Sequence, residues 1–393
     1  MQEVVIIGAG KIGRGYAAKI FFEEGYRIIF VDFWQEIVDE INDKKQYEIH
    51  EVDSDTHEVF KITGVSAIHG KDESEVVEAI SRVSVLVTAV GAGNLPKVAY
   101  SVAKAITFRA QNQIFSPLNV IMAENLKDGA RKFREMIEAY LDEETLVYLD
   151  HYVGIACSAI GRMIPPPPPS FKSHSIADVI VEPHQEFVTD ITGLKRPIPI
   201  IRGIDFTEDY QAAVARKLYI HNCTHAIMAY IGSLYGHDYS HDAMMDERVS
   251  SVVWQAMQET ARAVAVTYGL DKNELADYIQ KLFLRYQNHE LWDTLKRVGR
   301  DPIRKLQPDD RLIGSVRLVQ KVGGDPRPLV EGIAAAYCYH DPEDQSAVQL
   351  QEMIAERGLV DVLKEISDIS AGEALGESII KAITRLREDK RPV

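Results

Sequence analysis

The segment KLYIHNCTH, residues 217–225, places an amine, an amide and an imidazole close together along the chain. Lys217 and Asn222 are five residues apart, and His225 follows three residues later. On an α-helix with about 100° per residue, His225 lies about 80° and Asn222 about 140° around from Lys217. The three side chains then share one broad face, so the spacing predicts that a single cavity receives all of them.

These residue types suit the oxidation of an alcohol or the reduction of a ketone. A lysine on a largely apolar helix face is costly to bury as a cation, and a neutral amine there is a usable general base. The neutral amides of Asn222 and of Asn125, far away in sequence, can stabilise an alkoxide without competing for its proton. The alternative is a lysine with a buried stem whose ammonium group reaches solvent beside core polar residues.

The first thirty-two residues predict the element that would hold a redox cofactor. EVVIIG and YRIIFVD read as short β-strands, and they flank a glycine turn, GAGKIGRG, and a helical stretch, YAAKIFFEEG. Gly8, Gly10 and Gly13 satisfy G-x-G-x-x-G, with Lys11 and Ile12 between the last two. The first glycine permits a tight turn, the second admits a pyrophosphate, and the third lets helix and strand pack closely. Amides at the helix start then face the diphosphate.

Asp32 indicates which dinucleotide binds. It ends the second predicted strand about twenty residues after the glycines, where a carboxylate can accept both ribose hydroxyls of NAD. Its charge would repel the 2'-phosphate of NADP, and no arginine follows immediately in DFWQE. The sequence therefore predicts NAD as the cofactor.

Further strands at 84–91 and 118–125, separated by a helical stretch around PKVAYSVAKAI, predict a parallel, doubly wound sheet. Ligands of such sheets lie beyond the carboxyl ends of the strands. Gly91 is then expected to border the cofactor, and Glu124 and Asn125 to lie near its reactive ring. Asn125 can equally serve only to turn the chain.

The predicted fold class is an α/β Rossmann-type domain followed by a mostly α-helical domain. The pattern is irregular from about 145 to 205 and includes five prolines, which cannot donate backbone hydrogen bonds and favour an extended connection. From about 207 onward, apolar residues recur at helical spacing. We therefore expect an NAD-binding domain with an irregular extension over 1–195 and a helical substrate domain over 196–393.

Charge and composition exclude several classes of partner. The 393 residues include 44 Lys and Arg against 59 Asp and Glu, and the net charge of -15 disfavours nucleic acid. The sequence contains no run of eighteen uncharged apolar residues, which argues against a membrane span. No cationic leader precedes the first predicted strand, which argues against export. Three scattered cysteines suit a reducing compartment. We expect a cytoplasmic monomer or small homo-oligomer that acts on small molecules.

One basic segment stands out in this acidic chain. Arg300, Arg304, Lys305 and Arg311 lie close together within VGRDPIRKLQPDDRLI. Such a group can bind a substrate phosphate through charge-assisted hydrogen bonds. It can equally form an interdomain network of salt bridges with the many carboxylates, and the sequence alone leaves both interpretations open.

The segment HDYSHD, residues 237–242, superficially resembles a set of metal ligands. It lies between two helical patterns, where Asp and Ser commonly cap the helix that follows. We interpret it as a helix start, and we predict no metal.

The spacing of Lys217, Asn222 and His225 resembles the K-x(4)-N-x(2)-H signature of the polyol-specific long-chain dehydrogenases, the mannitol dehydrogenase family. Further similar segments, in an order and overall length typical of the sugar-phosphate branch, are GAGKIGRG (8–15), SPLNVIMAEN (116–125), RKLYIHNCTHAIMAYIG (216–232), VGRDPIRKLQPDDRLI (298–313) and LVEGIAAA (329–336).

The resemblance implies a metal-free, NAD-dependent oxidation of a secondary alcohol. Lys217 would be the general base, Asn125 and Asn222 would polarise the substrate oxygen, and His225 would position it. The expected substrate is a polyol, foremost a hexitol phosphate. The alternatives are reduction of an unphosphorylated ketose or keto-uronate, and an NAD-responsive binding protein that kept the fold.

Three positions depart from the family pattern. The branch usually has D-S-A-V-D-R after its central strand, whereas this chain reads CSAIGR, with Cys157 and Gly161 where carboxylates are expected. Ala215 stands where a glutamate is common, two residues before the lysine. The resemblance then implies that contacts to polyol hydroxyls and the route of the proton to solvent differ here.

Overall fold

The computed structural model describes residues 2–124, 126, 128–168 and 171–389, and it divides into two compact units, Met1–Tyr210 and Gln211–Val393. The first unit is an α/β domain and the second is helical, so the predicted fold class is confirmed. The boundary predicted at 195/196 lies within the first unit, because β11 (Asp205–Thr207) still pairs with β10 (Phe187–Asp190).

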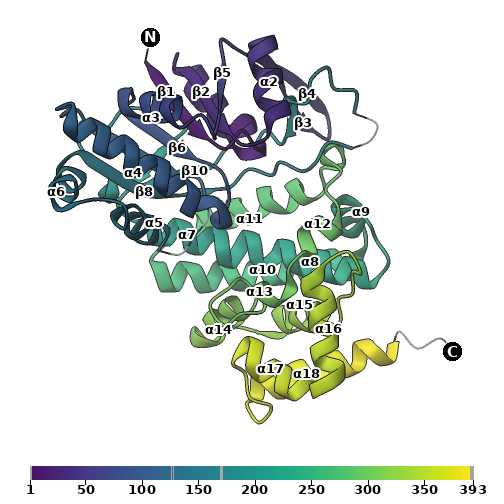
Figure 1. Ribbon diagram of the computed structural model, residues 1–393. Helices are drawn as coiled ribbons and strands as arrows, with labels where there is room; N and C mark the ends of the chain where they lie inside the picture. Colours follow the sequence, from purple (N-terminus) through teal and green to yellow (C-terminus); the bar gives the residue numbers. More distant parts are fainter. Residues whose placement is uncertain (1, 125, 127, 169–170, 390–393) are drawn as a thin grey trace. The chain divides into compact units, whose positions relative to one another are not determined.

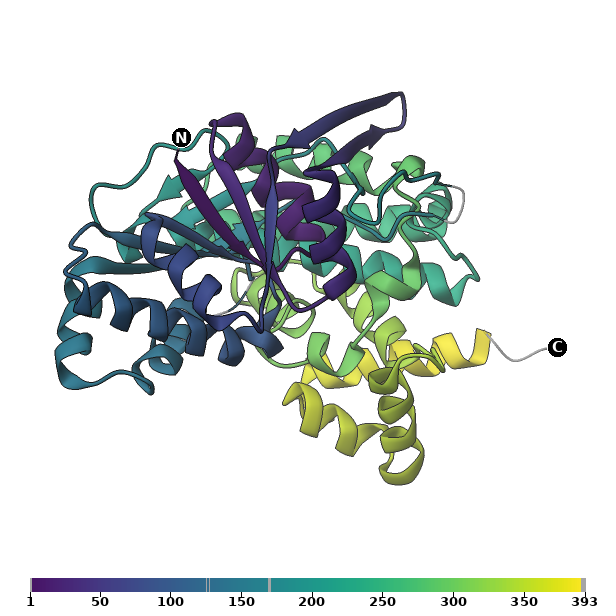
Figure 2. The ribbon, with the colours of Figure 1, turned by 45° about the horizontal axis from the view of Figure 1, so that its top comes forward.

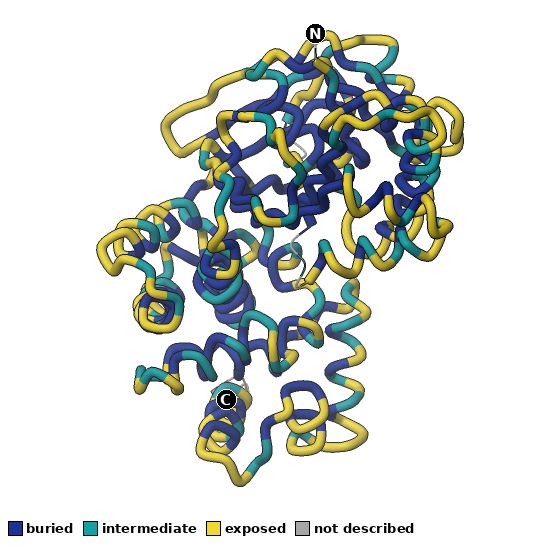
Figure 3. The backbone as a smooth tube through the Cα atoms, turned by 90° about the vertical axis from the view of Figure 1, so that its left-hand side faces the viewer, coloured by how far each residue is buried: buried dark blue, intermediate teal, exposed yellow. Residues whose placement is uncertain are grey.

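An eight-stranded sheet forms the centre of the first unit, in the order β11-β10-β8-β7-β6-β1-β2-β5. Six of its strands are parallel, and β10 joins antiparallel to β8. The central strands are continuous apolar runs that are buried on both faces, as expected for a parallel sheet covered by helices (Figure 3). The parallel strands are β1 (Glu3–Ile7), β2 (Arg27–Asp32), β5 (Ser66–His69), β6 (Val85–Thr88), β7 (Leu118–Met122) and β8 (Val153–Ile160).

Helices cover this sheet on both faces. Right-handed crossovers place α1 and α2 on one face, and α3 and α4, which pack against each other, on the other (Figure 1). The helix after the glycine turn begins with a π-helical stretch, η1. The helices of the first unit are η1 (Gly13–Ala17), α1 (Ala18–Glu23), α2 (Gln35–Lys44), α3 (Glu73–Arg82), α4 (Leu95–Gln111), α5 (Gly129–Glu138) and α6 (Glu143–Tyr152).

A second, three-stranded sheet belongs to the first unit. β3 (Gln46–Asp53) and β4 (Thr56–Thr63) form an antiparallel hairpin, and β9 (Val179–Val181) pairs parallel to β3. Figure 2 shows this hairpin as a long two-stranded ribbon that extends beyond the main sheet. The pairing brings together segments that are 130 residues apart in the chain, since Glu48 N donates a hydrogen bond to Asp178 Oδ1.

The second unit is built around α8 (Cys223–Leu234), which is buried on nearly all sides. An all-round apolar helix is stable only inside a core, and α8 packs against α9, α10, α12 and α15. The remaining elements with these neighbours are α7 (Tyr210–Ala215), η4 (Arg216–Asn222), α9 (Ser240–Met245), α10 (Glu247–Tyr268), α11 (Lys272–Tyr286), α12 (Leu295–Gly299), α13 (Pro302–Lys305), α14 (Ile313–Lys321), α15 (Arg327–Tyr337), α16 (Gln345–Arg357), α17 (Leu359–Ser367) and α18 (Ala374–Asp389).

No helix in the described parts of the chain is long and apolar enough to cross a bilayer.

Candidate functional site

The glycine turn has the geometry of a diphosphate cradle. Gly8 has φ +105°, and a Cβ there would collide with the carbonyl of Ala89. A Cβ on Gly13 would collide with the carbonyl of Gly8, whereas the nearest atom to a Cβ on Gly10 lies 4.0 Å away. Gly8 and Gly13 are therefore required by packing, and Gly10 leaves open space over the backbone. Lys11 and Ile12, half-buried, lead into the helix after the turn.

Asp32 lies at the end of β2, directly beside this turn. Its Oδ2 accepts a hydrogen bond from Ala9 N at 2.7 Å, and its Oδ1 accepts one from Trp34 N at 2.9 Å. These two amides orient the carboxylate, and each oxygen keeps a further lone pair for a ribose hydroxyl.

A cavity of about 540 Å³ opens next to Asp32 at the carboxyl ends of β2 and β5. Aromatic rings form much of its wall, and its size is in the range of small-molecule sites. Its lining residues are Phe33, Gly70, Lys71, Glu73, Pro96, Lys97, Tyr100, Ser101 and Tyr140.

The turns after β6 and β7 are joined by a buried carboxylate. Glu124 accepts hydrogen bonds from the Thr88 hydroxyl at 2.6 Å and from Val90 N at 2.8 Å. This pairing fixes the turn in which Gly91, exposed and with φ +78°, begins a short 3₁₀ helix. Asn125, for which we predicted a role at the reactive ring, lies outside the described residues.

Lys217 and Asn222 lie in a π-helix, η4, not in the α-helix that the sequence predicted. Hydrogen bonds from i to i+5 bring residues five apart within a single turn. Lys217 and Asn222 therefore share one face more closely than the predicted separation of about 140°. Lys217 is only 8% exposed, so a lysine here is indeed buried.

Asn222 and His225 line a polar cavity of about 210 Å³ in the second unit. The same cavity is lined by all four basic residues singled out in the sequence, from Arg300 to Arg311. Lys217 is outside this lining, although it lies in the same π-helix as Asn222. The structure thus joins two of the three residues of KLYIHNCTH to the basic segment. The full lining is Asn222, His225, Ala226, Arg297, Val298, Arg300, Arg304, Lys305 and Arg311.

The four basic residues differ in their partners. Arg304 pairs with Asp301 at 2.7 Å and Arg311 with Asp310 at 2.8 Å. Arg300 is exposed, and within the described residues its guanidinium has no ion pair. Both pairs are local contacts within the second unit, and neither is the interdomain network that the sequence left open.

Lys305 is buried, and its Nζ donates a hydrogen bond to the carbonyl oxygen of Arg300. Burial, followed by the charges of Arg311 and Arg304, holds the pKa of Lys305 well below its usual value. An anion in the cavity would offset both charges and favour the protonated form of this lysine.

Sequence reasoning missed the residues that hold His225. Its Nε2 lies 3.4 Å from Asp293 Oδ2, within ion-pair range although not aligned as a hydrogen bond, and its ring stacks on Tyr286 with centroids 4.8 Å apart. Asp293 is 3% exposed and accepts two hydrogen bonds from Arg297, at 2.5 and 2.6 Å. Burial lowers the pKa of His225, and the Asp293 carboxylate opposes that shift.

Comparison with known proteins identifies the family. Residues 2–203 match the mannitol dehydrogenase Rossmann domain, and residues 209–387 match the mannitol dehydrogenase C-terminal domain. The chain belongs to the mannitol dehydrogenase family. The predictions of an NAD-dependent polyol dehydrogenase and of NAD as its cofactor are confirmed at this level.

Solved structures of polyol dehydrogenases share the fold. The Pseudomonas fluorescens mannitol 2-dehydrogenase, in a ternary complex with NAD and D-mannitol, matches with a TM-score of 0.76 and 17% identity, over 99% of this chain and 91% of that chain. A substrate-free D-sorbitol dehydrogenase matches with a TM-score of 0.81 and 15% identity, over 98% of this chain and 93% of that chain. At 17% and 15% identity, these matches show that this chain has the same fold as the two dehydrogenases.

The departures from the mannitol dehydrogenase pattern have a structural counterpart. A Cβ on Gly161 would collide with the carboxylate of Glu186, which therefore occupies the space that a side chain at position 161 would need. Cys157 is buried, accepts a hydrogen bond from Ala130 N, and has a pKa raised by burial to about 11. Ala215 is buried at the end of α7. A carboxylate is thus present beside position 161, but it belongs to Glu186, which directly precedes β10, and not to a residue of β8.

The HDYSHD segment covers the turn before α9 and the first three residues of that helix, which begins at Ser240. His237 Nε2 lies 2.9 Å from Asp246 Oδ2, and Asp246 in turn caps α10 by accepting from Arg248 N. The start of α9 has no side-chain cap, so the capping expected of this segment is not seen.

Changing Asp32 should alter the choice of cofactor. We expect the unaltered protein to prefer NAD over NADP in kcat/KM, and Asp32→Asn to lose roughly 10- to 100-fold with NAD, because one charge-assisted contact contributes about 1.5 to 3 kcal/mol. The matched control is Glu36→Gln, which removes an exposed charge in the first turn of α2. Equal use of both cofactors by the unaltered protein would contradict the assignment.

Proposed function

We propose that this protein interconverts a hexitol phosphate and the corresponding ketose phosphate with NAD, the reaction of a mannitol-1-phosphate 5-dehydrogenase. The observation that carries the proposal is the 210 Å³ cavity in which Asn222 and His225 lie together with four basic side chains. A polyol site alone requires hydrogen-bonding groups, but it does not require this density of positive charge.

The roles follow from the residue types and their placement. Lys217, buried in the π-helix, accepts the hydroxyl proton, and the Asn222 amide donates a hydrogen bond to the oxygen on which negative charge develops. His225, fixed by Asp293 and Tyr286, positions the substrate. Bound NAD supplies the hydride acceptor.

The first unit offers a separate place for each part of the dinucleotide. We assign the diphosphate to the open space above Gly10 and the adenosine ribose to Asp32. Phe33 and Tyr100, which line the 540 Å³ cavity, would hold the adenine ring through aromatic contacts.

The phosphate assignment rests on electrostatics. A dianionic phosphate approaches a chain of net charge -15, so it binds only where positive charge is concentrated. Arg300 supplies a guanidinium that has no ion pair among the described residues, and a bound anion would favour the protonated form of Lys305. Both groups act through charge-assisted hydrogen bonds, which are the strongest type.

The second candidate is the reduction of an unphosphorylated keto-uronate, whose carboxylate an arginine can also bind in a bidentate manner. Aspartates already pair with Arg304 and Arg311, so less positive charge is left in the cavity. This favours a carboxylate with one negative charge over a phosphate with two. A screen of NADH consumption over ketose phosphates, ketoses and keto-uronates at equal concentration separates the candidates. The highest kcat/KM on a ketohexose phosphate supports the proposal, and the highest value on a keto-uronate replaces it.

Replacing Asp293 should change the pH dependence of the reaction. The carboxylate favours protonated His225, so Asp293→Asn lowers the histidine pKa further and moves the acidic limb of the kcat/KM profile to lower pH. We expect the KM for substrate to rise about tenfold, while the Kd for NADH stays constant. Asp242→Asn, an exposed aspartate on α9, is the control. If the acidic limb of Asp293→Asn matched that of the unaltered protein, Asp293 would have no role in positioning His225.

A further inference from the structure

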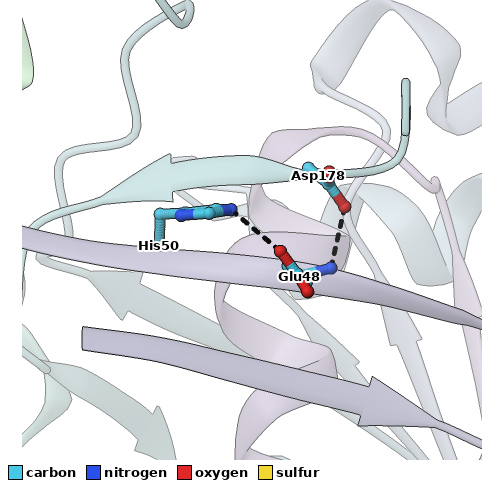
Figure 4. A group of neighbouring side chains, drawn as sticks. All are labelled: Glu48, His50 and Asp178. Carbon is cyan, nitrogen blue, oxygen red and sulfur yellow. Dashed lines mark hydrogen bonds and ion pairs between the residues drawn. The ribbon is translucent and has the colours of Figure 1, made fainter. Parts of the chain in front are cut away.

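Three side chains with metal-binding chemistry meet in the small sheet of the first unit (Figure 4). Glu48 and His50 lie two residues apart on β3, so they point to the same face of the strand. Asp178 directly precedes β9, the strand that pairs with β3. One ligand atom from each residue lies within 4.8 Å of the others. This group is remote in sequence from every residue assigned above to the reaction.

The imidazole of His50 is held in a defined orientation. The residue is 8% exposed, the edge of its ring meets Phe171, and its Nδ1 lies 3.0 Å from His57 Nε2. Its other nitrogen, Nε2, points towards Glu48 as Figure 4 shows, but makes no hydrogen bond. When Nδ1–H donates to His57, Nε2 carries a lone pair, which is the arrangement typical of a metal-ligating histidine.

An ordinary ion pair does not account for this group. The distance from His50 Nε2 to Glu48 Oε2 is 3.5 Å, and this nitrogen makes no hydrogen bond, so the two groups are not joined by a well-formed contact. Within the described residues, neither Glu48 nor Asp178 forms an ion pair with a lysine or arginine. In the tautomer with the proton on Nδ1, the lone pair of His50 Nε2 faces carboxylates that no lysine or arginine of the described residues neutralises.

Asp178 is oriented by its own hydrogen bonds. Its Oδ2 accepts from the Ser173 hydroxyl and from the amides of His174 and Ser175, at 2.9 to 3.1 Å. From the described residues its Oδ1 accepts one hydrogen bond, from Glu48 N at 2.8 Å, which leaves a lone pair on that oxygen. Such outer contacts fix the ligand atoms of known metal sites in the same way.

We propose that Glu48, His50 and Asp178 form a binding site for one divalent cation, with Zn²⁺ the best fit. One imidazole nitrogen and two carboxylate oxygens suit Zn²⁺, and water completes the coordination. Ligand atoms about 2.1 Å from zinc lie roughly 3.4 Å apart, so the present group must contract. The Glu48 side chain, 29% exposed, is free to make that movement. A bound ion would tie β3 to the segment before β9 and stabilise the small sheet.

Metal titration of the untagged, chelator-treated protein tests the site. We expect one equivalent of Zn²⁺ per chain by elemental analysis, and an increase in Tm of about 5 °C or more at saturating metal. Glu48→Gln should weaken Zn²⁺ binding at least tenfold. The matched control, Glu58→Gln, removes an exposed carboxylate from the neighbouring strand β4 and should bind zinc as the unaltered protein does.

Visible absorption of the Co²⁺-loaded protein gives a second readout that does not depend on stability. His50→Gln should change this spectrum, because it removes the only nitrogen ligand of the proposed set. Binding of Mn²⁺ instead of Zn²⁺ with the same dependence on Glu48 and His50 also supports a divalent-cation site. Less than one equivalent of metal in the unaltered protein, or equal affinity in Glu48→Gln and Glu58→Gln, would overturn the proposal.

Discussion

Lys217→Ala should lower kcat by roughly 10²- to 10⁴-fold, the usual effect of losing one positioned base, and leave the affinity for NADH nearly unchanged. Lys217 lies in the helical unit, whereas the glycine turn and Asp32 belong to the α/β unit. The substitution therefore removes proton transfer and does not touch the residues assigned to the dinucleotide.

Steady-state kinetics and fluorescence titration with NADH measure the two quantities separately. The control is Lys281→Ala, an exposed lysine on α11 in the same unit. Small primary amines added to Lys217→Ala should restore part of the activity, because they replace the missing base without repairing any packing defect. A near-normal kcat in Lys217→Ala would contradict the proposal that Lys217 is the general base.

The fold of the first unit follows from short-range patterns, which is why the sequence predicts it well. Gly8 and Gly13 are required by contacts with nearby backbone, and each central strand is a continuous apolar run. Asp32 is found by its spacing from the glycines. Its Oδ2 accepts a hydrogen bond from Ala9 N, so the strand end and the glycine turn lie side by side. Local sequence and local geometry agree in this part of the molecule.

The features that the sequence did not predict depend on long-range contacts or on fine backbone geometry. Nothing in KLYIHNCTH distinguishes a π-helix from an α-helix, since apolar spacing tolerates both. His225 and Asp293 are in contact but lie far apart in the sequence, so no local motif connects them. The same holds for Glu48 and Asp178, which meet only through the pairing of β3 with β9. Single-sequence patterns carry information about periodicity, not about such pairings.

The basic segment shows how structure narrows an interpretation that sequence leaves open. Four cations within VGRDPIRKLQPDDRLI looked equivalent, and either a phosphate site or a salt-bridge network explained them. Their contacts differ: Arg304 and Arg311 have aspartate partners, Lys305 is buried, and Arg300 has no ion pair in the part of the chain that the structure describes. Each of them still lines the cavity beside His225.

Arg300→Ala should therefore raise the KM for a ketohexose phosphate by about ten- to a hundred-fold, because one charge-assisted contact contributes roughly 1.5 to 3 kcal/mol. Its activity on the free ketose should stay unchanged. Arg304→Ala should have the smaller effect, since Asp301 already offsets much of that charge. The KM for the phosphate, and not that for the free ketose, should also rise with ionic strength.

Kinetics of both variants on the two substrates measure this difference, with Arg327→Ala as the control. Arg327 is an arginine of the same unit whose side chain is 87% exposed, and it pairs with Asp325 away from the cavity. An equal loss on phosphorylated and free ketose would show that the basic segment is structural. An unphosphorylated substrate would then become the better candidate, because Cys157 and Gly161 stand where the family pattern has carboxylates.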